Sequence, residues 1–425
     1  MPHTSKKEHI VIIGSGFAGL KLLNCLDKRK FRITIIDYNN YHSFPPLFYQ
    51  IASAGIEPAG ICFPVRAEIR RFTNEGVRFK MMRVKTINSF SKYISDGKNK
   101  IWYDKLVIAA GTTNNFFGIS GLENSVYTLK STPEAIRLRN DILALLEEAS
   151  LESDSEKRKE MLRFVVVGGG PTGVETAGAL GEMKRYILKR QYPDIHPDEV
   201  SVKLVEGNHR LLGTMTEKSS EQAEKYLKEL GVEVFTGVRM KSYSDNNIVT
   251  DKGNIPATML IWTAGITSTS FSYEGATPEF SRGHRIAVNG FNAVVGMNDV
   301  YAIGDIAISI SDPAYPDGHP QLAQIAIQQA ENLAANLNFQ PKKLMKPFRY
   351  KDRGSMATVG RNRAVADLPK LHLGGFLAWI LWMFIHLISI LGTRNKISVL
   401  INWSWGYFTY GSSLRMLFKI AEKPN

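Results

Sequence analysis

The chain has 425 residues, 44% of them hydrophobic, which is enough for two or three domains with cores of their own. Its formal net charge of +13 favours an anionic partner, either nucleic acid or a membrane surface. Because the sequence has no helix-turn-helix, zinc knuckle or arginine-rich arm, we expect no nucleic-acid partner and favour the membrane.

The first predicted element is a strand–turn–helix unit near the N-terminus, which shows no signal-peptide pattern. Its turn, G-S-G-F-A-G, places Gly14, Gly16 and Gly19 in a G-x-G-x-x-G pattern. The first glycine allows the turn, the second lets backbone approach a pyrophosphate, and the third lets helix and strand pack closely. Asp37 ends the next predicted strand and can accept ribose hydroxyls. This pattern predicts a nucleotide site; the alternative is a glycine-rich turn that only packs.

A second unit of the same kind follows, with Gly168, Gly170 and Gly173. Its acid, Glu206, comes 33 residues after Gly173 (206 − 173), farther than the usual spacing of about 20. A helix running from 174 to about 191 would absorb the extra length. Two such units in one chain predict two bound dinucleotides.

Glu206 bears on the choice between NADH and NADPH. A carboxylate there would hydrogen-bond the 2′-hydroxyl of NADH and repel the 2′-phosphate of NADPH, so we predict NADH. Nearby Arg210 could instead accept a 2′-phosphate. Glu175, expected in the first helical turn of this unit, is either a partner of the helix dipole or a group near the docked nicotinamide or quinone. The residues alone leave both open.

Later in the chain, Gly304 and Asp305 follow an apolar run, where an acid can hold the ribityl and pyrophosphate part of a flavin. A Gly-Asp pair is also common in ordinary loops. Gln324 and Gln328 share one face of a predicted helix, and their amides can bind a quinone carbonyl. The alternative is a polar stripe on an amphipathic helix.

The C-terminal part contains an uncharged stretch, 371–393, between Lys370 and Arg394. As a helix it would extend roughly 34 Å, which is enough to cross a bilayer core of about 30 Å. A second uncharged stretch, 397–414, is rich in aromatic residues. Three structures are compatible with these stretches: a membrane-spanning helix, an anchor on one side of the membrane, and a buried helix or dimer face. We favour the one-sided anchor. In the anchor, four tryptophans would sit at headgroup level: Trp379, Trp382, Trp403 and Trp405.

Several segments show a family resemblance over nearly the whole chain. They are GSGFAG, IIDYNNYHSFPPLFYQIASAG, AAGTTNNFFGI, VVVGGGPTGVETAGAL, LIWTAGI, VYAIGDIA and LAQIAIQQA. With them the chain resembles the type II NADH dehydrogenases, which are single-subunit, non-proton-pumping NADH:quinone oxidoreductases. The resemblance implies an α/β fold with two Rossmann-type domains, as in two-domain flavin reductases, and a C-terminal membrane-attachment region. FAD would bind 1–118 with 285–340, NADH would bind 119–284, and 341–425 would attach to the membrane.

The same resemblance implies roles for individual residues. Gln324 and Gln328 correspond to glutamines of the quinone pocket, and Glu175 corresponds to an acid near the nicotinamide and quinone. Gly265 would contribute to the NADH site. Ala330 stands where many relatives have glycine. Besides the first glycine loop and its acid, the residues expected around FAD are Phe17, Ala18, Asn39, Val84, Gly304, Asp305, Ala323 and Gln324.

The predicted function is therefore transfer of hydride from NADH to non-covalent FAD and of two electrons to a membrane quinone. We expect a membrane-associated protein on the cytoplasmic face of an inner or plasma membrane, with no metal site. A homodimer is one assembly that we consider. A soluble flavin reductase of an electron-carrier protein, or a flavin-bound protein of the apoptosis-inducing-factor type, is the alternative. Disulfide reductases and sulfide:quinone oxidoreductases need cysteines that this chain lacks, since its cysteines are Cys25 and Cys62.

Overall fold

The computed structural model describes residues 7–339, 345–409 and 415–417. The chain folds into two compact units and passes between them several times. Short strands stand near these passages: β3 (Tyr41–Ser43), β4 (Cys62–Pro64), β10 (Thr112–Asn114) and β19 (Ile266–Ser268). Unit 1 comprises Met1–His42, Phe63–Thr113 and Ile266–Asp352, and unit 2 comprises Ser43–Cys62, Asn114–Gly265 and Arg353–Asn425.

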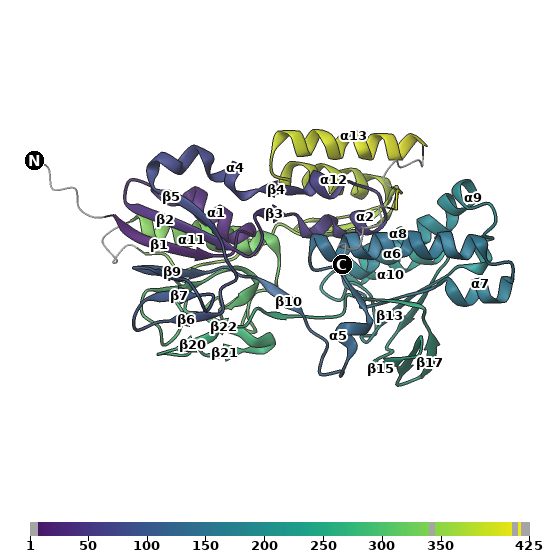
Figure 1. Cartoon of the computed structure of the whole chain (residues 1–425), viewed down its shortest axis with the longest axis horizontal. Coiled ribbons are helices and arrows are strands. Elements are labelled where there is room, and N and C mark those ends of the chain that lie inside the picture. The colour runs from purple at the N-terminus through teal and green to yellow at the C-terminus, as the bar shows by residue number, and fades with distance from the viewer. Residues whose placement is uncertain (1–6, 340–344, 410–414, 418–425) are drawn as a thin grey trace, which may run out of the picture. The chain divides into compact units, whose positions relative to one another are not determined.

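Unit 1 is built on a five-stranded parallel sheet in the order β23-β9-β1-β2-β5. The central strand, β1, is almost entirely buried, which explains its unbroken apolar sequence. Helices α1 and α11 pack against each other beside this sheet (Figure 1). The elements are β1 (Glu8–Ile13), α1 (Phe17–Cys25), β2 (Phe31–Asp37), β5 (Val77–Met81), β9 (Lys105–Ile108), β23 (Val300–Ala302) and α11 (Ala323–Asn338).

Two smaller sheets complete unit 1, together with helix α4 (Val65–Ile69). A buried cluster joins residues of both small sheets to β1 and β9, so these layers share one core. One sheet has the order β20-β6-β7-β8 and the other β21-β22-β24. Their strands are β6 (Thr86–Asn88), β7 (Tyr93–Ser95), β8 (Lys100–Trp102), β20 (Ser272–Glu274), β21 (Phe280–Ser281), β22 (Arg285–Ala287) and β24 (Ala307–Ile308).

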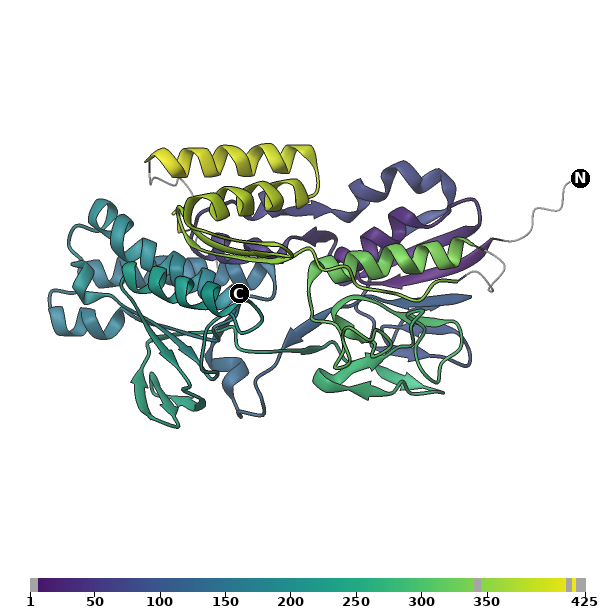
Figure 2. The same ribbon diagram turned by 180° about the vertical axis from the view of Figure 1, so that it is seen from behind.

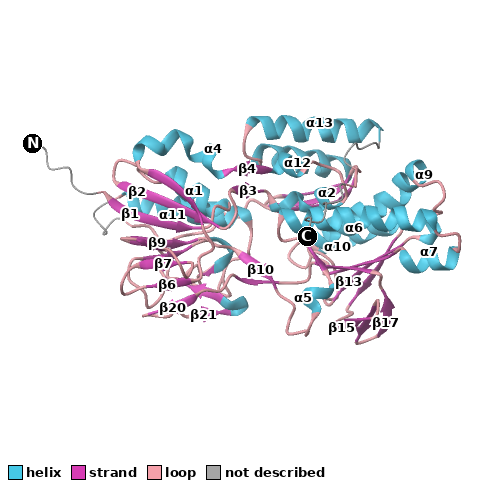
Figure 3. Ribbon diagram, viewed as in Figure 1, coloured by secondary structure: helices cyan, strands magenta, loops and turns pink. Residues whose placement is uncertain are grey.

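Unit 2 contains a second five-stranded parallel sheet, in the order β11-β18-β12-β13-β14. Its strand after the glycine loop, β13, lies beside the strand before it, β12, just as β2 lies beside β1 in unit 1. Helices α6, α8 and α10 form a layer against the sheet (Figure 3). The elements are β11 (Tyr127–Thr128), α6 (Thr132–Leu151), β12 (Arg163–Val167), α8 (Pro171–Glu182), β13 (Ser201–Glu206), α10 (Glu217–Glu229), β14 (Val232–Thr236) and β18 (Met259–Trp262).

The helical run after the second glycine loop continues to Gln191, as predicted from the long spacing to Glu206. Helix α8 passes into a π-helical turn (Met183–Ile187) and then α9 (Leu188–Gln191). The remaining elements of this part are α5 (Leu122–Ser125), α7 (Ser155–Met161), β15 (Met240–Ser244), β16 (Asn247–Thr250) and β17 (Gly253–Pro256).

The C-terminal part of unit 2 is a three-stranded antiparallel sheet followed by two helices, which run side by side (Figures 1 and 2). Strand β25 packs against α8, and α12 packs on β26. The segments of the N-terminal half that belong to this unit form α2 (Phe48–Ala52) and α3 (Pro58–Ile61). The C-terminal elements are β25 (Ser355–Gly360), β26 (Arg363–Leu368), β27 (Leu371–Gly374), α12 (Gly375–Ser389) and α13 (Thr393–Thr409).

The uncharged stretch 371–393 is therefore not one continuous helix. Its first four residues pair with β26 as strand β27, the next 15 form α12, and its last residue, Thr393, begins α13. Among the described residues, no helix combines the length and the apolar character needed to cross a bilayer. Trp382 also departs from the expected headgroup position, because it is 1% exposed and buried within unit 2.

Candidate functional site

The first glycine loop joins β1 to α1 with the geometry that its pattern predicts. Gly14 has a φ of +106°, and a Cβ there would lie 2.2 Å from the carbonyl oxygen of Ala109. A Cβ at Gly19 would lie 1.9 Å from the Gly14 oxygen. A Cβ at Gly16 would meet no atom within 4 Å. Close backbone contacts therefore require the first and third glycines, whereas the second borders open space.

Helix α1 begins beside this open space without a capping side chain. Its N-cap is Gly16, no side chain accepts a hydrogen bond there, and its first turn has no acidic residue. The first N–H groups of a helix lack partners within the helix and carry partial positive charge. The start of α1 therefore fits a phosphate or pyrophosphate group.

Asp37 holds the first loop from the end of β2. Its Oδ2 accepts hydrogen bonds from the Ser15 backbone N–H (2.7 Å) and hydroxyl (2.8 Å), and its Oδ1 accepts one from the Asn39 N–H (2.9 Å). On the other side of the loop, His42 Nδ1 lies 2.9 Å from the Ser15 oxygen. Burial lowers the pKa of His42, which favours a neutral, hydrogen-bonding imidazole.

The segment at Gly304 lies against both helices of unit 1. Gly304 has a φ of +75°, and a Cβ there would lie 3.3 Å from the Ala18 Cβ of α1 and 3.4 Å from the Ala326 Cβ of α11. Its N–H donates a 2.7 Å hydrogen bond to the buried Gln329 amide. The Asp305 carbonyl accepts a hydrogen bond from Gln321 (2.9 Å). The fold thus brings the first glycine loop and Gly304 together.

The other residues predicted around FAD also belong to unit 1. Helix α11 begins at Ala323, with no capping side chain and no acid in its first turn, and Gln324 follows half-buried. Phe17 is the first residue of α1, and its ring makes an edge contact with His42. Val84 is 9% exposed and belongs to the core cluster of the unit.

The second glycine loop repeats the geometry of the first. Gly168 has a φ of +113°, and a Cβ there would lie 2.6 Å from the backbone of Ala264. A Cβ at Gly173 would lie 1.8 Å from the Gly168 oxygen, and a Cβ at Gly170 would meet no atom within 4 Å. Helix α8 starts directly afterwards, with Pro171 in its first turn and no capping side chain. This helix start therefore also presents its first N–H groups beside open space.

Glu206 holds the second loop as Asp37 holds the first. Its Oε2 accepts the Gly169 N–H at 2.5 Å, and its Oε1 accepts both the backbone and the side-chain N–H of Asn208 at 2.6 Å. The Arg210 guanidinium donates to the carbonyls of Met215 and Gly213, each at 2.8 Å. Because these carbonyls hold Arg210 in its own loop, it is a less suitable partner for a 2′-phosphate.

Gly265, the remaining residue predicted for the second site, is held by the segment that precedes β11. Its carbonyl accepts the Asn115 N–H at 3.0 Å. A Cβ at Gly265 would lie 2.6 Å from the ring of Phe117. The glycine therefore makes room for this aromatic ring.

Glu175 is buried in unit 2 and lies beyond the first turn of α8. The helix begins at Pro171, so Glu175 is its fifth residue, and the first turn has no acid. The expected helix-dipole position is therefore wrong. Glu175 is 6% exposed, and its Oε1 accepts a long 3.5 Å hydrogen bond from the Thr358 N–H of β25. The Trp382 indole N–H favours the charged form of Glu175, although it makes no well-formed hydrogen bond with any described group.

Burial governs the ionisation of Glu175. It raises the pKa of the carboxyl group well above its ordinary value, and the Thr358 and Trp382 N–H groups offset this only in part. Tyr49 also has a pKa raised well above its usual value, first by burial and then by the charge of Glu175. Burial therefore favours the protonated form of Glu175 and the neutral form of Tyr49.

A chain of hydrogen bonds links this acid region to α13. The Trp403 indole N–H donates to Gln50 Oε1 (2.7 Å), and the Gln50 amide N–H donates to the Tyr49 hydroxyl (2.9 Å). The Tyr49 and Trp382 rings have centroids 6.5 Å apart. The half-buried Trp403 is thus held to the protein through its indole N–H.

The Gln328 side chain forms hydrogen bonds with the protein backbone within unit 1. Its Nε2 donates to the Lys351 oxygen and its Oε1 accepts from the Lys351 N–H, both at 3.0 Å. One turn later, Asn332 Nδ2 donates to the Lys346 oxygen at 3.1 Å. Gln328 therefore ties the segment before Lys351 to α11, whatever else it binds.

Comparisons with known proteins match both parts of this architecture. The family model described as pyridine nucleotide-disulphide oxidoreductase matches residues 8–330, and the model described as NDH2 C-terminal domain matches 353–409. The type II NADH:quinone oxidoreductase Ndh of Mycobacterium tuberculosis is 32% identical over 94% of this chain and 88% of its own length.

The chain belongs to the type II NADH:quinone oxidoreductase family.

Two solved structures show how widely the fold of this family is shared. The NDH2 of Plasmodium falciparum, solved in complex with NADH, superposes with a TM-score of 0.89 at 24% identity, covering 97% of this chain and 100% of the other. The sulfide:quinone oxidoreductase of Aquifex aeolicus superposes with a TM-score of 0.70 at 18% identity, with 95% of each chain covered. At these identities the likeness concerns the fold.

In this member of the type II NADH:quinone oxidoreductases, some supporting residues could not be singled out from the sequence. Gln329 is 1% exposed and positions Gly304, but it stands beside two other glutamines that look alike in the sequence. Gly178 allows α8 to approach β25, because a Cβ there would lie 2.0 Å from the Val359 oxygen. The small residues in the AGAL segment were the available signal for this close approach.

Proposed function

We propose that this protein takes hydride from NADH and passes two electrons to a membrane quinone, using non-covalent FAD and without pumping protons. The observation that carries the proposal is the repeated glycine loop with its acid, present once in each unit of a chain that belongs to this family. When bound, FAD would accept the hydride from NADH and then pass two electrons to the quinone. The protein residues bind and orient FAD and NADH, and they exclude water from the site.

The first loop fits the pyrophosphate of FAD, because Gly16 borders open space at an uncapped helix start. Asp37 would accept a ribose hydroxyl. The other residues that we propose around FAD are Gly14, Phe17, Ala18, Gly19, Asn39, Val84, Gly304, Asp305, Ala323 and Gln324. We retain 1–118 with 285–340 as the proposed FAD domain.

The second loop fits the pyrophosphate of NADH for the same reason, with Gly170 at the open position. Glu206 would select the 2′-hydroxyl of NADH, and the engagement of Arg210 with loop carbonyls supports this choice. Gly168, Gly173 and Gly265 complete the proposed site within 119–284.

For quinone reduction we propose roles for Glu175, Gln324 and Gln328. Burial favours the protonated form of Glu175, and a protonated carboxyl group can supply its proton to a reduced quinone oxygen. The glutamine amides can donate to the quinone carbonyls. For Gln328 this role competes with its two hydrogen bonds to Lys351, so its contribution requires a direct test.

We propose that 341–425 attaches the protein to one face of a membrane through the outer faces of α12 and α13. On α12 the exposed apolar residues recur with helical spacing, and on α13 they do the same. Arg394, in the first turn of α13, is exposed and can meet lipid phosphates. The residues of this apolar face are Phe376, Leu377, Ile380, Phe384, Ile385, Ile388, Ile397, Leu400, Ile401, Trp405 and Phe408, between 37% and 81% exposed. The cytoplasmic side and a homodimer stay predictions.

Rapid-mixing absorbance spectroscopy of the purified protein tests the reaction. We expect a yellow protein that bleaches with NADH and regains its colour on addition of a soluble quinone. A protein that bleaches but ignores every quinone would instead support a reductase of another acceptor. A folded protein without colour would contradict the FAD assignment.

A further inference from the structure

Beyond the parallel sheet of unit 2, the loops that follow β13 and β14 lie side by side. The Val238 N–H donates to the Glu206 oxygen (3.0 Å), and the Gly237 N–H donates to the Asn208 oxygen (2.7 Å). We call residues 206–209 and 237–239 the ledge. Because the ledge lies at the carboxyl ends of the strands, where α/β sheets bind dinucleotides, it borders the proposed NADH site at Glu206.

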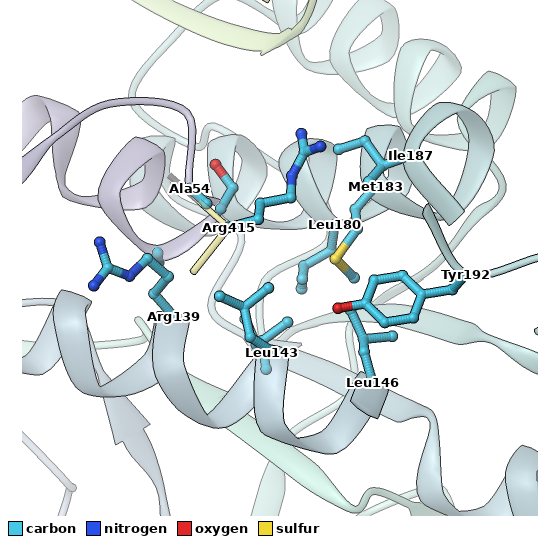
Figure 4. Close-up of a pocket in the computed structure, with 12 residues that line it drawn as sticks. Ala54, Arg139, Leu143, Leu146, Leu180, Met183, Ile187, Tyr192 and Arg415 are labelled. Carbon is cyan, nitrogen blue, oxygen red and sulfur yellow. The ribbon is translucent and has the colours of Figure 1, made fainter. Parts of the chain in front are cut away.

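A bound NADH needs room for its adenosine half as well as for its pyrophosphate. The pocket between α6 and the end of α8, shown in Figure 4, has room for about one water molecule, so it cannot hold this half. The adenine base is bonded to C1′ of the ribose, next to the carbon that carries the 2′-hydroxyl. A ribose held at Glu206 therefore places the base beside the neighbouring residues of the ledge.

Arg239 crosses the ledge beside Glu206. A Cβ at Gly207 would lie 3.3 Å from the Arg239 Cγ and 3.8 Å from its Nε, so the glycine leaves room for this side chain. Asp251 holds the Arg239 backbone in place: its Oδ1 accepts the Arg239 N–H (2.8 Å), and its own N–H donates to the Arg239 oxygen (3.0 Å). The side chain therefore extends from a fixed backbone over the residue that follows Glu206.

The Arg239 guanidinium is available to a ligand. Within the described ranges it forms no hydrogen bond, ion pair or ring contact, and the residue is exposed. Arg210, by contrast, donates to two carbonyls of its own loop. A guanidinium is planar and weakly hydrated, and it stacks on the faces of aromatic rings. Arg239 can therefore offer a flat, cationic face to an adenine ring.

Two further basic side chains border the ledge. A Cβ at Gly237 would lie 3.4 Å from the His209 Nδ1 and 3.5 Å from the Lys252 Nζ. Neither side chain forms an ion pair with a described carboxylate. NADH is an anion, so these groups favour its approach to this part of unit 2. Lys252 has a positive charge but no planar face, which makes it a control for the role of Arg239.

We propose that Arg239 binds the adenine ring of NADH by stacking its guanidinium on the face of the base, while Glu206 accepts the ribose hydroxyl. This inference rests on the proposed function, because it adds a residue to the NADH site of the second glycine loop. Arg239 thereby contributes to the recognition of a dinucleotide over a nicotinamide mononucleotide.

The comparison of NADH with reduced nicotinamide mononucleotide tests this role. The mononucleotide carries the same hydride donor but lacks the adenosine half. In the full-length protein with its flavin, Arg239→Gln should lower the rate constant for flavin bleaching at low NADH concentration about tenfold, the loss expected for one stacked base. The rate constant with the mononucleotide should not change. Equal losses with both substrates, or no loss with NADH, would overturn the proposal.

Two variants separate stacking from charge. Arg239→Lys keeps the positive charge but loses the planar face, so it should lower the rate constant for NADH nearly as much as Arg239→Gln does. Lys252→Gln removes one positive charge at the same ledge and should change this rate constant by less than about twofold, because exposed charges are screened by salt. An unchanged rate constant in Arg239→Lys, or equal losses in Arg239→Gln and Lys252→Gln, would overturn the stacking role.

Binding of ADP-ribose separates this proposal from the proposed function. ADP-ribose contains the adenosine half and the pyrophosphate but no nicotinamide, so its binding does not depend on hydride transfer. Titration calorimetry should give a dissociation constant about tenfold higher for Arg239→Gln than for the natural protein. If NADH fails to bleach the flavin but ADP-ribose shows this difference, the proposed function fails and the adenine contact stands. Equal dissociation constants, or no binding to the natural protein, would overturn the contact.

Discussion

Asp37 and Glu206 each accept three hydrogen bonds in their own unit, and the partners correspond. One is the N–H of the second residue in the glycine loop, and another is the N–H two residues after the acid. A carboxylate has about four acceptor positions, so about one is left for a ribose hydroxyl. Each acid therefore shapes its loop as well as offering a ligand contact, which means that its removal would affect both.

Glu206→Gln should relax the choice between the two nicotinamide dinucleotides. The amide oxygen keeps an acceptor for the loop, but the negative charge that repels a 2′-phosphate is lost. We expect kcat/KM for NADPH relative to NADH to rise about tenfold, corresponding to ~1.4 kcal/mol. Steady-state rates with both cofactors measure this. An unchanged ratio would show that another group sets the selectivity.

Glu175→Gln should change how stability depends on pH. The unfolded carboxyl releases its proton near its ordinary pKa of about 4.3, whereas the buried carboxyl of the folded protein keeps it to higher pH. Between these two pKa values the unfolded state binds fewer protons, so the free energy of unfolding falls by up to about 1.4 kcal/mol per pH unit. The glutamine side chain of the variant does not titrate, so the free energy of unfolding of the variant should not fall for this reason.

Denaturant unfolding of both proteins at pH 5 and pH 8 provides the measurement. The variant should gain stability relative to the natural protein as the pH rises. Parallel profiles would mean that Glu175 is ionised in the folded state. A fall of the variant relative to the natural protein would point to a stabilising charge instead.

Helix α11 combines two tasks. Its start lies at Gly304 beside α1, and its later turns hold the segment 346–351 through side-chain amides. Gln328 and Asn332, four residues apart, make these contacts from one face. A polar stripe on this helix is therefore explained by backbone contacts even before any quinone is considered.

Gln328→Ala separates the two roles of this glutamine when it is compared with Asn332→Ala. If Gln328 binds quinone, its loss should slow reoxidation of the reduced flavin about tenfold and leave reduction by NADH unchanged, because an amide hydrogen bond to the quinone is lost. Asn332→Ala removes a similar tether and should leave both steps unchanged. Equal slowing by both variants would assign the effect to the tether.

Helices α12 and α13 each have an inner and an outer face. Trp382 and Val399 are buried, whereas Phe384 and Phe408 are 59% and 81% exposed. At the end of α13, the Arg361 guanidinium donates to the carbonyls of Gly406 (2.7 Å) and Tyr407 (2.8 Å). Deleting everything after Pro369 would therefore damage the core of unit 2, so substitutions of outer residues test attachment better.

Phe384→Ser combined with Ile388→Ser should weaken binding to phospholipid vesicles. Burying a side chain of this kind contributes ~1.5–3 kcal/mol, so we expect at least a tenfold loss for each residue. Co-sedimentation with vesicles provides the measurement. Phe90→Ser is the control, because Phe90 is 78% exposed but belongs to unit 1. Equal losses for the control would contradict a specific face.

At the scale of the whole molecule, the chain builds the same strand–loop–helix device twice and then adds a third layer to unit 2. The formal charge of +13 is consistent with approach to an anionic membrane, but charge alone does not locate the surface. The exposed apolar residues of α12 and α13 form the surface that we propose for membrane attachment. The flavin experiment proposed above therefore needs the full chain, since the C-terminal layer also packs around Glu175.

The sequence by itself determined both glycine loops, their acids and the helical run to Gln191, because each depends on neighbouring residues along one strand–turn–helix segment. It also identified the family from local motifs. The tertiary structure decided the environment of Glu175, whose partner Thr358 is 183 positions away, the inward position of Trp382 and the tether of Gln328 to Lys351. Such contacts depend on which distant surfaces pack together, and the local pattern of a single sequence does not specify that.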